Sequence, residues 1–451
     1  MKTRLLLLGL LLPIHLGLGA AHAITSNDAQ PGEPDPTADV PHDDSPHEEP
    51  APPPDISGEV TLRDVLAATL TSSPRLRAYS WEVRSSDAKV LQAGLRPNPE
   101  LSINPENFVG SGAFGNQVQY QNTLQLSQLV ELGDKRELRR EAASATLDRT
   151  RMEYESARVE VLGAATIDFI DLVAAQEDVR IAKLAVAQAE ELVKAVDQRT
   201  KATIGSPLEG KRARIVMARS KNAHSEAVRS LQAAKQKLAA NWGSRGPGVR
   251  SASGDLFTTH PLPPLDQLLA QAESAPERRV ASAEEKVRAA EAALARSRRV
   301  SDVTVSGAWR TGRNWDDQAV VAGVSFPLKI FDRAQGDIAA SDAQVEKSKA
   351  ETVTVDVRLQ AAVFALYQEI VQAKDVTEGM AREIVPRAEE AMGIAKSGFA
   401  QGIYTQLDLL DTQRTLVEVR REHLLAGAKY HRLVAEVERL LGTPLNSHGR
   451  K

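Results

Sequence analysis

The sequence contains no cysteine. This absence excludes disulfide bonds, thiolate metal sites and a lipid attached to an N-terminal cysteine. Aromatic residues make up only 4% of the chain, whereas charged residues make up 26%. Such a composition is lean for a globular core and typical of long helices. The formal net charge of −4 gives no indication of nucleic-acid binding, so we expect no nucleic acid among the partners.

Long hydrophobic runs are also missing beyond the N-terminus, where none approaches the ~18 residues of a transmembrane helix. Residues 1–23 have the features of a secretory signal peptide, with Lys2 and Arg4 before an apolar run and a cleavage motif that ends at Ala23. The alternative, an uncleaved membrane anchor, requires a longer run of ~20 residues. Export without cysteine is typical of a bacterial envelope protein.

Residues 24–58 read as an acidic, proline-rich linker. Residues 24–57 hold nine prolines and nine acidic residues but neither lysine nor arginine. Such a segment cannot bury enough apolar surface to offset its ordering entropy, which predicts disorder. His42 and His47 lie among these acids and are weak candidates for zinc or cobalt ligands. A flexible charged tether is the preferred interpretation, because ordering the segment around a metal would cost affinity.

The remaining chain is duplicated with an offset near 200 residues. Pro74 aligns with Pro276, Ser127 with Ser325, Asp134 with Asp332, and Gly243 with Gly442. We therefore expect two repeats, at residues 59–245 and 263–443, with a linker at 246–262 and a tail at 444–451.

Each repeat reads as a helix, two strands, a very long helix and a long returning helix. The first helices are expected at residues 74–95 and 276–299, and prolines in "RPNPE" stop the earlier one. The strands are expected at residues 100–109, 117–130, 302–310 and 318–330. The first very long helix, residues 134–200, would extend roughly 100 Å.

A seven-residue apolar period gives each long helix a coiled-coil seam. Thr377 and Arg387 interrupt the second seam. The predicted seam positions are Leu172, Val179, Val186 and Val193 beside Ala175, Ala182, Ala189 and Val196, then Val363, Ile370 and Ile384 beside Leu366, Ala373, Met380 and Ile394.

The strands alternate between polar and apolar residues. In residues 117–126 the odd positions are all glutamine or threonine, while most even positions are apolar. This pattern is typical of a strand that faces lipid on one side and a lumen on the other. Four strands cannot close a barrel, because the smallest membrane barrels need about eight. Several chains must therefore share one barrel, and three chains with four strands each would supply twelve.

This plan resembles the TolC-like outer-membrane efflux proteins over residues 60–442. The segments "LSQLVELGDKRELRREAA" and "GVSFPLKIFDRAQGDIAAS" are most similar to the branch associated with cobalt, zinc and cadmium resistance. The resemblance implies a mainly α fold with a small β part, in a trimer whose 12-stranded outer-membrane barrel continues into a periplasmic helical barrel. It also implies a periplasmic adaptor, a proton-driven inner-membrane pump of the resistance-nodulation-division type, and contact with outer-membrane lipid.

Asp408 and Asp411 match the acidic positions that ring the periplasmic constriction in that family. Their spacing of three residues puts both on one helix face, so three copies would place six carboxylates around a pore. The alternative is a pair of solvated surface acids. Glu209 is the possible counterpart in the first repeat, but Arg212 stands where Asp411 would be, so a salt bridge there is possible.

Gly205 and Gly402 are expected to form the turns at the helix tips, which in the family face the adaptor. Both glycines could equally be purely structural. The sequence contains no recognisable catalytic constellation and no phosphate-binding glycine loop, so neither an enzyme nor a cofactor is predicted.

The leading hypothesis is the outer-membrane channel of a tripartite system that exports divalent heavy-metal cations of the cobalt, zinc, cadmium or nickel class. A second hypothesis keeps the channel but assigns it organic compounds or type I secretion. A third is a soluble periplasmic coiled-coil scaffold.

Overall fold

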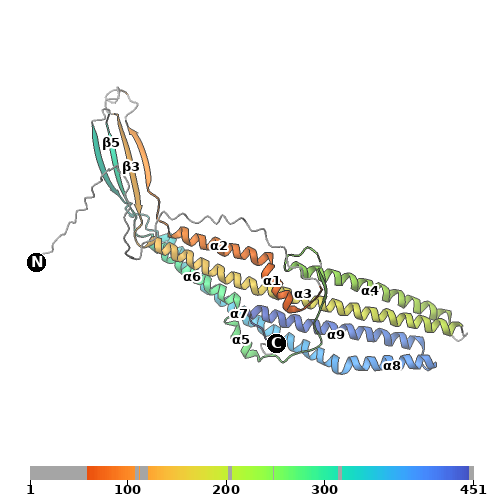
Figure 1. Ribbon diagram of the computed structural model, residues 1–451. Coiled ribbons are helices and arrows are strands. Elements are labelled where there is room, and N and C mark those ends of the chain that lie inside the picture. Colours follow the sequence, from red (N-terminus) through yellow and green to blue (C-terminus); the bar gives the residue numbers. More distant parts are fainter. Residues whose placement is uncertain are drawn as a thin grey trace, which may run out of the picture. The chain divides into compact units, whose positions relative to one another are not determined.

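The computed structural model describes residues 58–106, 111, 120–201, 206–246, 248–312 and 317–445. The predicted signal peptide, His42 and His47 lie outside these residues. Figure 1 shows the arrangement of the elements, which are β1 (Gly58–Val60), α1 (Leu62–Ser72), α2 (Pro74–Gly94), β2 (Glu100–Glu106), β3 (Gln121–Val130), α3 (Lys135–Lys201), α4 (Pro207–Ala240), β4 (Val249–Ala252), α5 (Leu265–Ala272), α6 (Pro276–Ser297), β5 (Val303–Thr311), β6 (Gln318–Ser325), α7 (Gln335–Gly379), a π-helical segment (Met380–Ile384), α8 (Val385–Gln401) and α9 (Gln406–Leu441).

The two repeats close in the same way. After α4, Gly243 adopts a φ of 80°, and after α9, Gly442 adopts a φ of 72°, a region that favours glycine. A Cβ atom at Gly243 would lie 3.0 Å from Cγ of Pro74, and one at Gly442 would lie 2.8 Å from Cγ of Pro276. The aligned glycines and prolines therefore touch each other in both repeats, where the end of the returning helix meets the start of α2 or α6.

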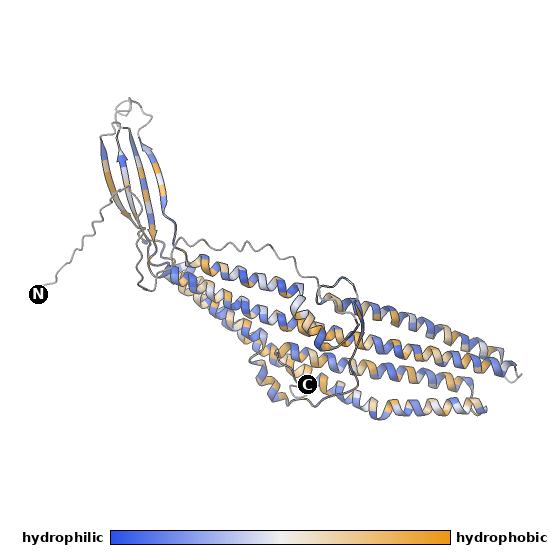
Figure 2. Cartoon of the chain, viewed as in Figure 1, coloured by the Kyte–Doolittle hydropathy of each residue, from blue (hydrophilic) through white to orange (hydrophobic). Residues whose placement is uncertain are grey.

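The four longer strands form one antiparallel sheet in the order β2-β3-β5-β6. Its register places Leu124 opposite Ile103 on one side and Trp309 on the other, and Trp309 opposite Val320. Residues directly opposite one another in a ladder project from the same face, so these exposed apolar side chains share one face of the sheet. Figure 2 shows hydrophobic and hydrophilic residues alternating along the strands. The opposite face carries residues such as Thr123, whose Oγ1 accepts a hydrogen bond from Nε of Arg310 at 3.1 Å.

The predicted strand boundaries need one correction. β6 ends at Ser325 and not at residue 330. Ser325 pairs with Thr304, so only Val303 of β5 remains beyond this point and the ladder cannot continue to residue 330. Pro327 also lacks the amide hydrogen that a ladder requires. The predicted ends of β2 and β3 that face the first strand turn, residues 107–109 and 117–119, lie outside the described residues.

The helix α3 confirms the predicted uninterrupted long helix. It has 67 residues, which at ~1.5 Å per residue extend roughly 100 Å from the sheet. Leu172, Ala182, Ala189 and Val196 of its seam are buried. α3 packs against α2, α4, α6 and α9, so it is shared by both repeats. Among the described helices, none is long and apolar enough to cross a membrane.

The second long helix departs from its predicted seam. Val363, Ile370 and Met380 are buried as expected, but Ile384 and Ile394 are 45% and 51% exposed. The π-helical segment between α7 and α8 adds a residue to one turn and rotates every later position around the helix. A strict seven-residue period therefore cannot be extended past Met380.

The segment between the repeats, residues 248–262, packs across the middle of the helices, and we call it the strap. β4 pairs in parallel with β1, and the side-chain amide of Gln176 exchanges two hydrogen bonds with the backbone of Ala252. Leu256 is buried with Trp242 and Leu172 in the largest described core cluster. The predicted linker at residues 246–262 thus contributes to the core. The sequence did not predict this, because so short a segment shows no clear apolar period.

Gly427 tests this packing. A Cβ atom there would lie 2.2 Å from the backbone oxygen of Leu256, so we expect Gly427→Ala to lower the free energy of unfolding by about 1–3 kcal/mol through overpacking. Thermal or urea unfolding in detergent measures the change. Gly393→Ala is the control, because that helical site is open and should gain up to about 1 kcal/mol from helix propensity. A wild-type midpoint for Gly427→Ala would contradict the packing described here.

Candidate functional site at the helix tips

The candidate site lies at the end of the long helices remote from the sheet, where α3 turns into α4 and α8 turns into α9. Ser206 caps α4 by accepting a hydrogen bond from the amide of Leu208 at 3.2 Å. Gly402 ends α8 with a φ of 79°, so the predicted glycine turn is present there. The ring of Tyr404 lies directly over Gly398, where a Cβ atom would approach it to 2.1 Å. Gly205 lies outside the described residues.

Asp408 is exposed and forms part of the cap of α9. Its Oδ2 accepts hydrogen bonds from the amide of Thr405 at 2.8 Å and from the Thr405 hydroxyl at 2.7 Å. The amide of Asp408 donates in return to Oγ1 of Thr405 at 3.3 Å, which completes a capping box. The hydrogen bonds from Thr405 lower the pKa of Asp408 and keep this carboxylate charged.

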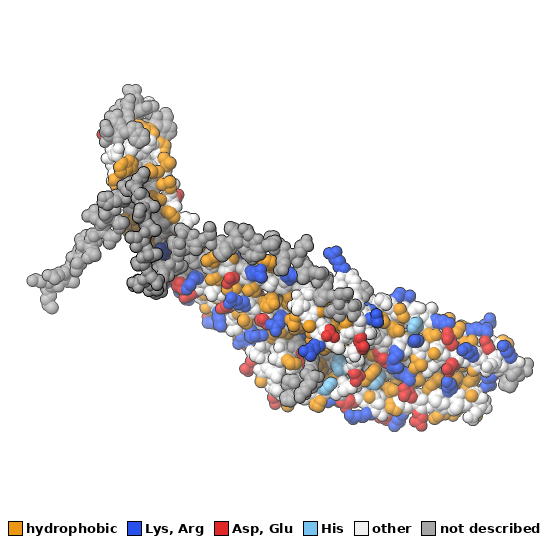
Figure 3. Space-filling view, viewed as in Figure 1, with side chains coloured by type: hydrophobic (Ala, Val, Ile, Leu, Met, Phe, Trp, Pro, Cys, Tyr) orange, Lys and Arg blue, Asp and Glu red, His pale blue; other side chains and the backbone are white. Residues whose placement is uncertain are grey.

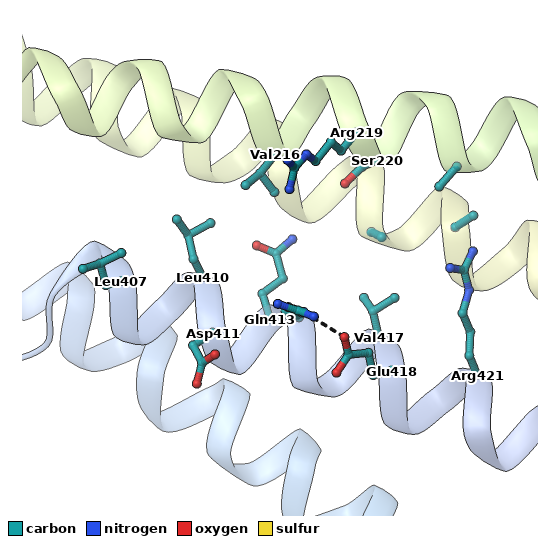
Figure 4. Close-up of a pocket in the computed structure, with 14 residues that line it drawn as sticks. Val216, Arg219, Ser220, Leu407, Leu410, Asp411, Gln413, Val417, Glu418 and Arg421 are labelled. Atoms are coloured by element: carbon teal, nitrogen blue, oxygen red, sulfur yellow. Dashed lines mark hydrogen bonds and ion pairs between the residues drawn. The ribbon is translucent and has the colours of Figure 1, made fainter.

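Asp411 lies one turn further along α9, at a groove of about 630 Å³ between α4 and α9. Figure 4 shows Leu410 and Gln413 pointing from α9 toward α4, whereas the Asp411 carboxylate turns away from α4. Arg414 forms an ion pair with Glu418 at 2.8 Å. The hydrogen bond that Arg414 donates to Glu418, together with the negative charges of Glu418 and Asp411, raises the pKa of Arg414. The groove therefore has a mixed and not a purely acidic lining.

The environment of Glu209 differs from that of Asp408 and Asp411. It is half-buried, and its backbone oxygen accepts a hydrogen bond from Nε2 of the buried Gln406 at 2.8 Å. Its Oε2 atom is buried without a hydrogen-bond partner among the described residues. Arg212 is exposed, and within the described part of the chain it makes no ion pair with Asp411. The salt bridge that the sequence left open is therefore absent within one described chain.

Three polar contacts between described residues at the tips join the two repeats, beside an apolar cluster that includes Val196 and Phe399, and they were not predicted. Nη1 of Arg199 donates to the backbone oxygen of Phe399 at 3.0 Å, and its guanidinium lies 4.9 Å from the centre of the Phe399 ring. Lys396 forms an ion pair with Glu191 at 2.9 Å. The Gln406 hydrogen bond is the third. Arg199 and Phe399 are 200 residues apart, so the repeat offset was the one signal in the sequence that could have paired them.

The described residues contain no group of three or more histidine, aspartate or glutamate side chains arranged to hold a metal ion.

The comparisons with known proteins agree with this architecture. Residues 65–244 and 267–443 match the family described as outer membrane efflux protein. The chain is 29% identical over 390 residues to the cobalt-zinc-cadmium resistance protein CzcC of Cupriavidus metallidurans, covering 86% of this chain and 92% of that protein. It is 24% identical over 305 residues to the nickel-cobalt-cadmium resistance protein NccC of Alcaligenes xylosoxydans xylosoxydans, covering 66% and 67% of the two proteins.

Solved structures share the fold. A crystal structure of CusC matches with a TM-score of 0.71 at 15% identity and covers 85% of this chain and 92% of that chain. The open state of the MtrE outer membrane channel of Neisseria gonorrhoeae matches with a TM-score of 0.68 at 16% identity, covering 86% and 91%.

These matches confirm the predicted resemblance, the mainly helical fold class of the TolC-like trimeric barrels and the location in the outer membrane with a periplasmic helical part. Channels of this family form homotrimers that work with an adaptor and an inner-membrane pump. Since the two matched segments together span more than half of the sequence, the chain belongs to the outer membrane efflux protein family.

Proposed function

We propose that this protein is the outer-membrane duct of a tripartite, proton-driven system that exports divalent heavy-metal cations of the cobalt, zinc, cadmium or nickel class. The observation that carries the proposal is the similarity to the cobalt-zinc-cadmium resistance protein, which extends over 86% of this chain and 92% of that protein. In this proposal the chain supplies a passive path, and a partner pump in the inner membrane supplies the driving force and selects the cargo.

The arrangement of free edges supports a ring of copies. β2 and β6 are the two outer strands of the sheet. The helices α4, α3, α9 and α8 lie side by side in this order, so α4 and α8 are the two outer helices (Figure 1). In the sheet and in the helical layer, the two outer elements, or margins, differ in sequence. One copy must therefore place its β6 and α8 against the β2 and α4 of the next copy. Such head-to-tail contacts close into rings. We therefore infer a homotrimer with β6 beside β2, and α8 beside α4, of adjacent copies.

Exposed side chains on these margins fit the same assembly. Leu208 and Ile215 on α4 and Ile394 on α8 are all more than half exposed in the single chain. Large apolar side chains at matching heights on two margins would be buried by the neighbouring copy, and their burial would stabilise the ring.

At the tips, the trimer would bring together three copies of Asp408 and Asp411, whose carboxylates would form the periplasmic gate. Such a ring attracts cations and repels anions through its field. The charge on Asp408 is secured by its capping hydrogen bonds. Glu209 is the proposed counterpart in the first repeat, and the turns at Gly205 and Gly402 are proposed to face the periplasmic adaptor.

Cysteine cross-linking tests the proposed ring, since the natural chain offers no competing thiol. Ile215 and Ile394 each lie about two helical turns from a tip, on opposite margins. We expect the double variant Ile215→Cys, Ile394→Cys to give covalent dimers and trimers with a short bismaleimide. Each single variant should stay monomeric on denaturing gels. The pair Ile215→Cys, Val353→Cys should also stay monomeric, because Ile215 lies near the tip end of α4 and Val353 lies in the half of α7 nearer the sheet. Equal cross-linking of the two pairs would contradict the inferred neighbours.

The cargo is tested in cells that lack this protein. We expect sensitivity to and retention of a few divalent metals among zinc, cobalt, cadmium, nickel and copper, measured by growth and by cellular metal content. Expression of the wild-type chain should restore resistance. Unchanged metal handling together with new sensitivity to drugs or detergents would keep the duct but reject the metal assignment, in favour of organic-compound export.

The gate is tested by ion selectivity in planar bilayers. We expect Asp411→Asn to lower the permeability ratio of potassium to chloride severalfold, because each trimer loses three charges at the narrowest point. Asp411 takes no part in the cap of α9, so the variant should fold normally. Asp87→Asn, an exposed change on α2, is the charge-matched control. If both variants retain the wild-type ratio, Asp411 does not line the constriction.

A further inference from the structure

The apolar surface of the sheet continues past its last hydrogen-bonded residue. Val320 and Val324 on the outer face of β6 are 76% and 66% exposed. The segment that follows β6 repeats this exposure, from 56% at Phe326 to 90% at Phe331. We call this segment the collar, which consists of Phe326, Leu328, Ile330 and Phe331. Figure 3 shows hydrophobic side chains over the described part of the sheet, whereas charged and hydrophobic side chains are mixed over the helices.

A basic segment lies directly beside the collar. The hydroxyl of Ser301 donates to the backbone oxygen of Pro327 at 2.7 Å, and the ammonium of Lys329 donates to the backbone oxygen of Arg298. These two hydrogen bonds hold the end of α6 against the collar. The arginines that flank this contact in the sequence are named the basic row, which consists of Arg296, Arg298, Arg299 and Arg333.

The basic row is only partly neutralised. Arg296 pairs with Asp342 at 2.5 Å and Arg298 with Asp337 at 3.2 Å, but the side chains of both pairs are about half exposed. Exposed ion pairs of this kind contribute little to stability, so their charges remain available to other partners. Arg299 and Arg333 are exposed and make no ion pair within the described part of the chain.

The equivalent place in the first repeat also has two exposed arginines, Arg96 and Arg136, without an ion pair among the described residues, but its other basic side chains are paired. Lys135 pairs with Asp302 at 2.6 Å, Arg139 with Glu131 at 2.6 Å, and Arg140 with Glu137 at 2.7 Å. The second repeat differs in its apolar segment, because Leu129, Val130 and Leu132 of the first repeat are 38–42% exposed, whereas the collar residues are 56–90% exposed.

We propose that the collar and the basic row bind an anionic phospholipid in the periplasmic leaflet of the outer membrane. Its phosphate would lie on Arg299 and Arg333, and its acyl chains would lie along Val320 and Val324. Aromatic side chains favour the membrane–water interface, and adjacent lysine and arginine side chains attract anionic headgroups. The proposal depends on the outer-membrane location of the sheet and is independent of the cargo, so it and the metal assignment can fail separately.

The test measures lipids that remain bound to the full chain in detergent, by native mass spectrometry, after exposure to equal amounts of phosphatidylglycerol and phosphatidylcholine. The wild type should retain phosphatidylglycerol preferentially. The variant Arg299→Gln, Arg333→Gln should lose this preference by roughly tenfold or more, because two cationic side chains near the headgroup are removed. The variant Arg229→Gln, Lys429→Gln removes two exposed charges from α4 and α9 and should behave as the wild type.

Three results would overturn the proposal. The wild type could show no preference between the two lipids, or both double variants could lose the preference equally. The third result is a loss of trimers in lipid-free detergent on Arg299→Gln, Arg333→Gln alone, which would show that the basic row contacts a neighbouring copy and not a lipid.

Discussion

Backbone hydrogen bonding at the margins of the four-stranded sheet is the constraint on which the other layers depend. β2 and β6 each leave one margin without a partner among the described strands, and in hydrocarbon every such amide and carbonyl costs roughly several kcal/mol. In the proposed trimer, further copies of the chain supply the missing partners. Because the two margins differ, the copies must join head to tail, and the helices that continue from the strands inherit the same neighbours.

The duplication explains why one chain can supply both margins of every layer. α3 packs against helices of both repeats, and the strap buries Leu256 between α3 and α9. The contacts at the tips join positions that are related by the repeat, as Arg199 and Phe399 show with their separation of 200 residues. The repeats are nevertheless unequal, since only the second long helix contains a π-helical segment, followed directly by Val385 and Pro386.

Much of this structure follows from patterns in the sequence. The alternation of residues 117–126 correctly assigned Leu124 and Leu126 to the exposed apolar face, because a strand has a strict two-residue period. The seam failed at Ile384 and Ile394, since one inserted residue rotates a helix without a clear mark in composition. The pair β1 and β4 escaped prediction because strands of three and four residues carry too little pattern.

The candidate site was less predictable than the fold. Asp408 and Asp411 were selected through resemblance, and spacing alone cannot distinguish a pore ring from surface acids. The structure shows that a local rule was also available for one of them, because threonine followed three residues later by an acid is the pattern of a capping box. The polar contacts that join the two repeats at the helix tips involve residues about 200 positions apart, and helical periodicity carries no information about such pairs.

Capping and gating make compatible demands on Asp408. A carboxylate in the first turn of a helix is stabilised by the unpaired amides and by the helix dipole, so it remains charged even where like charges gather. Asp411 lies beyond that turn and shows no capping hydrogen bond among the described residues, so its carboxylate is not engaged by the helix terminus. In the proposed trimer, Asp408 would thus supply a fixed negative field, while Asp411 would be the carboxylate whose charge a passing cation compensates.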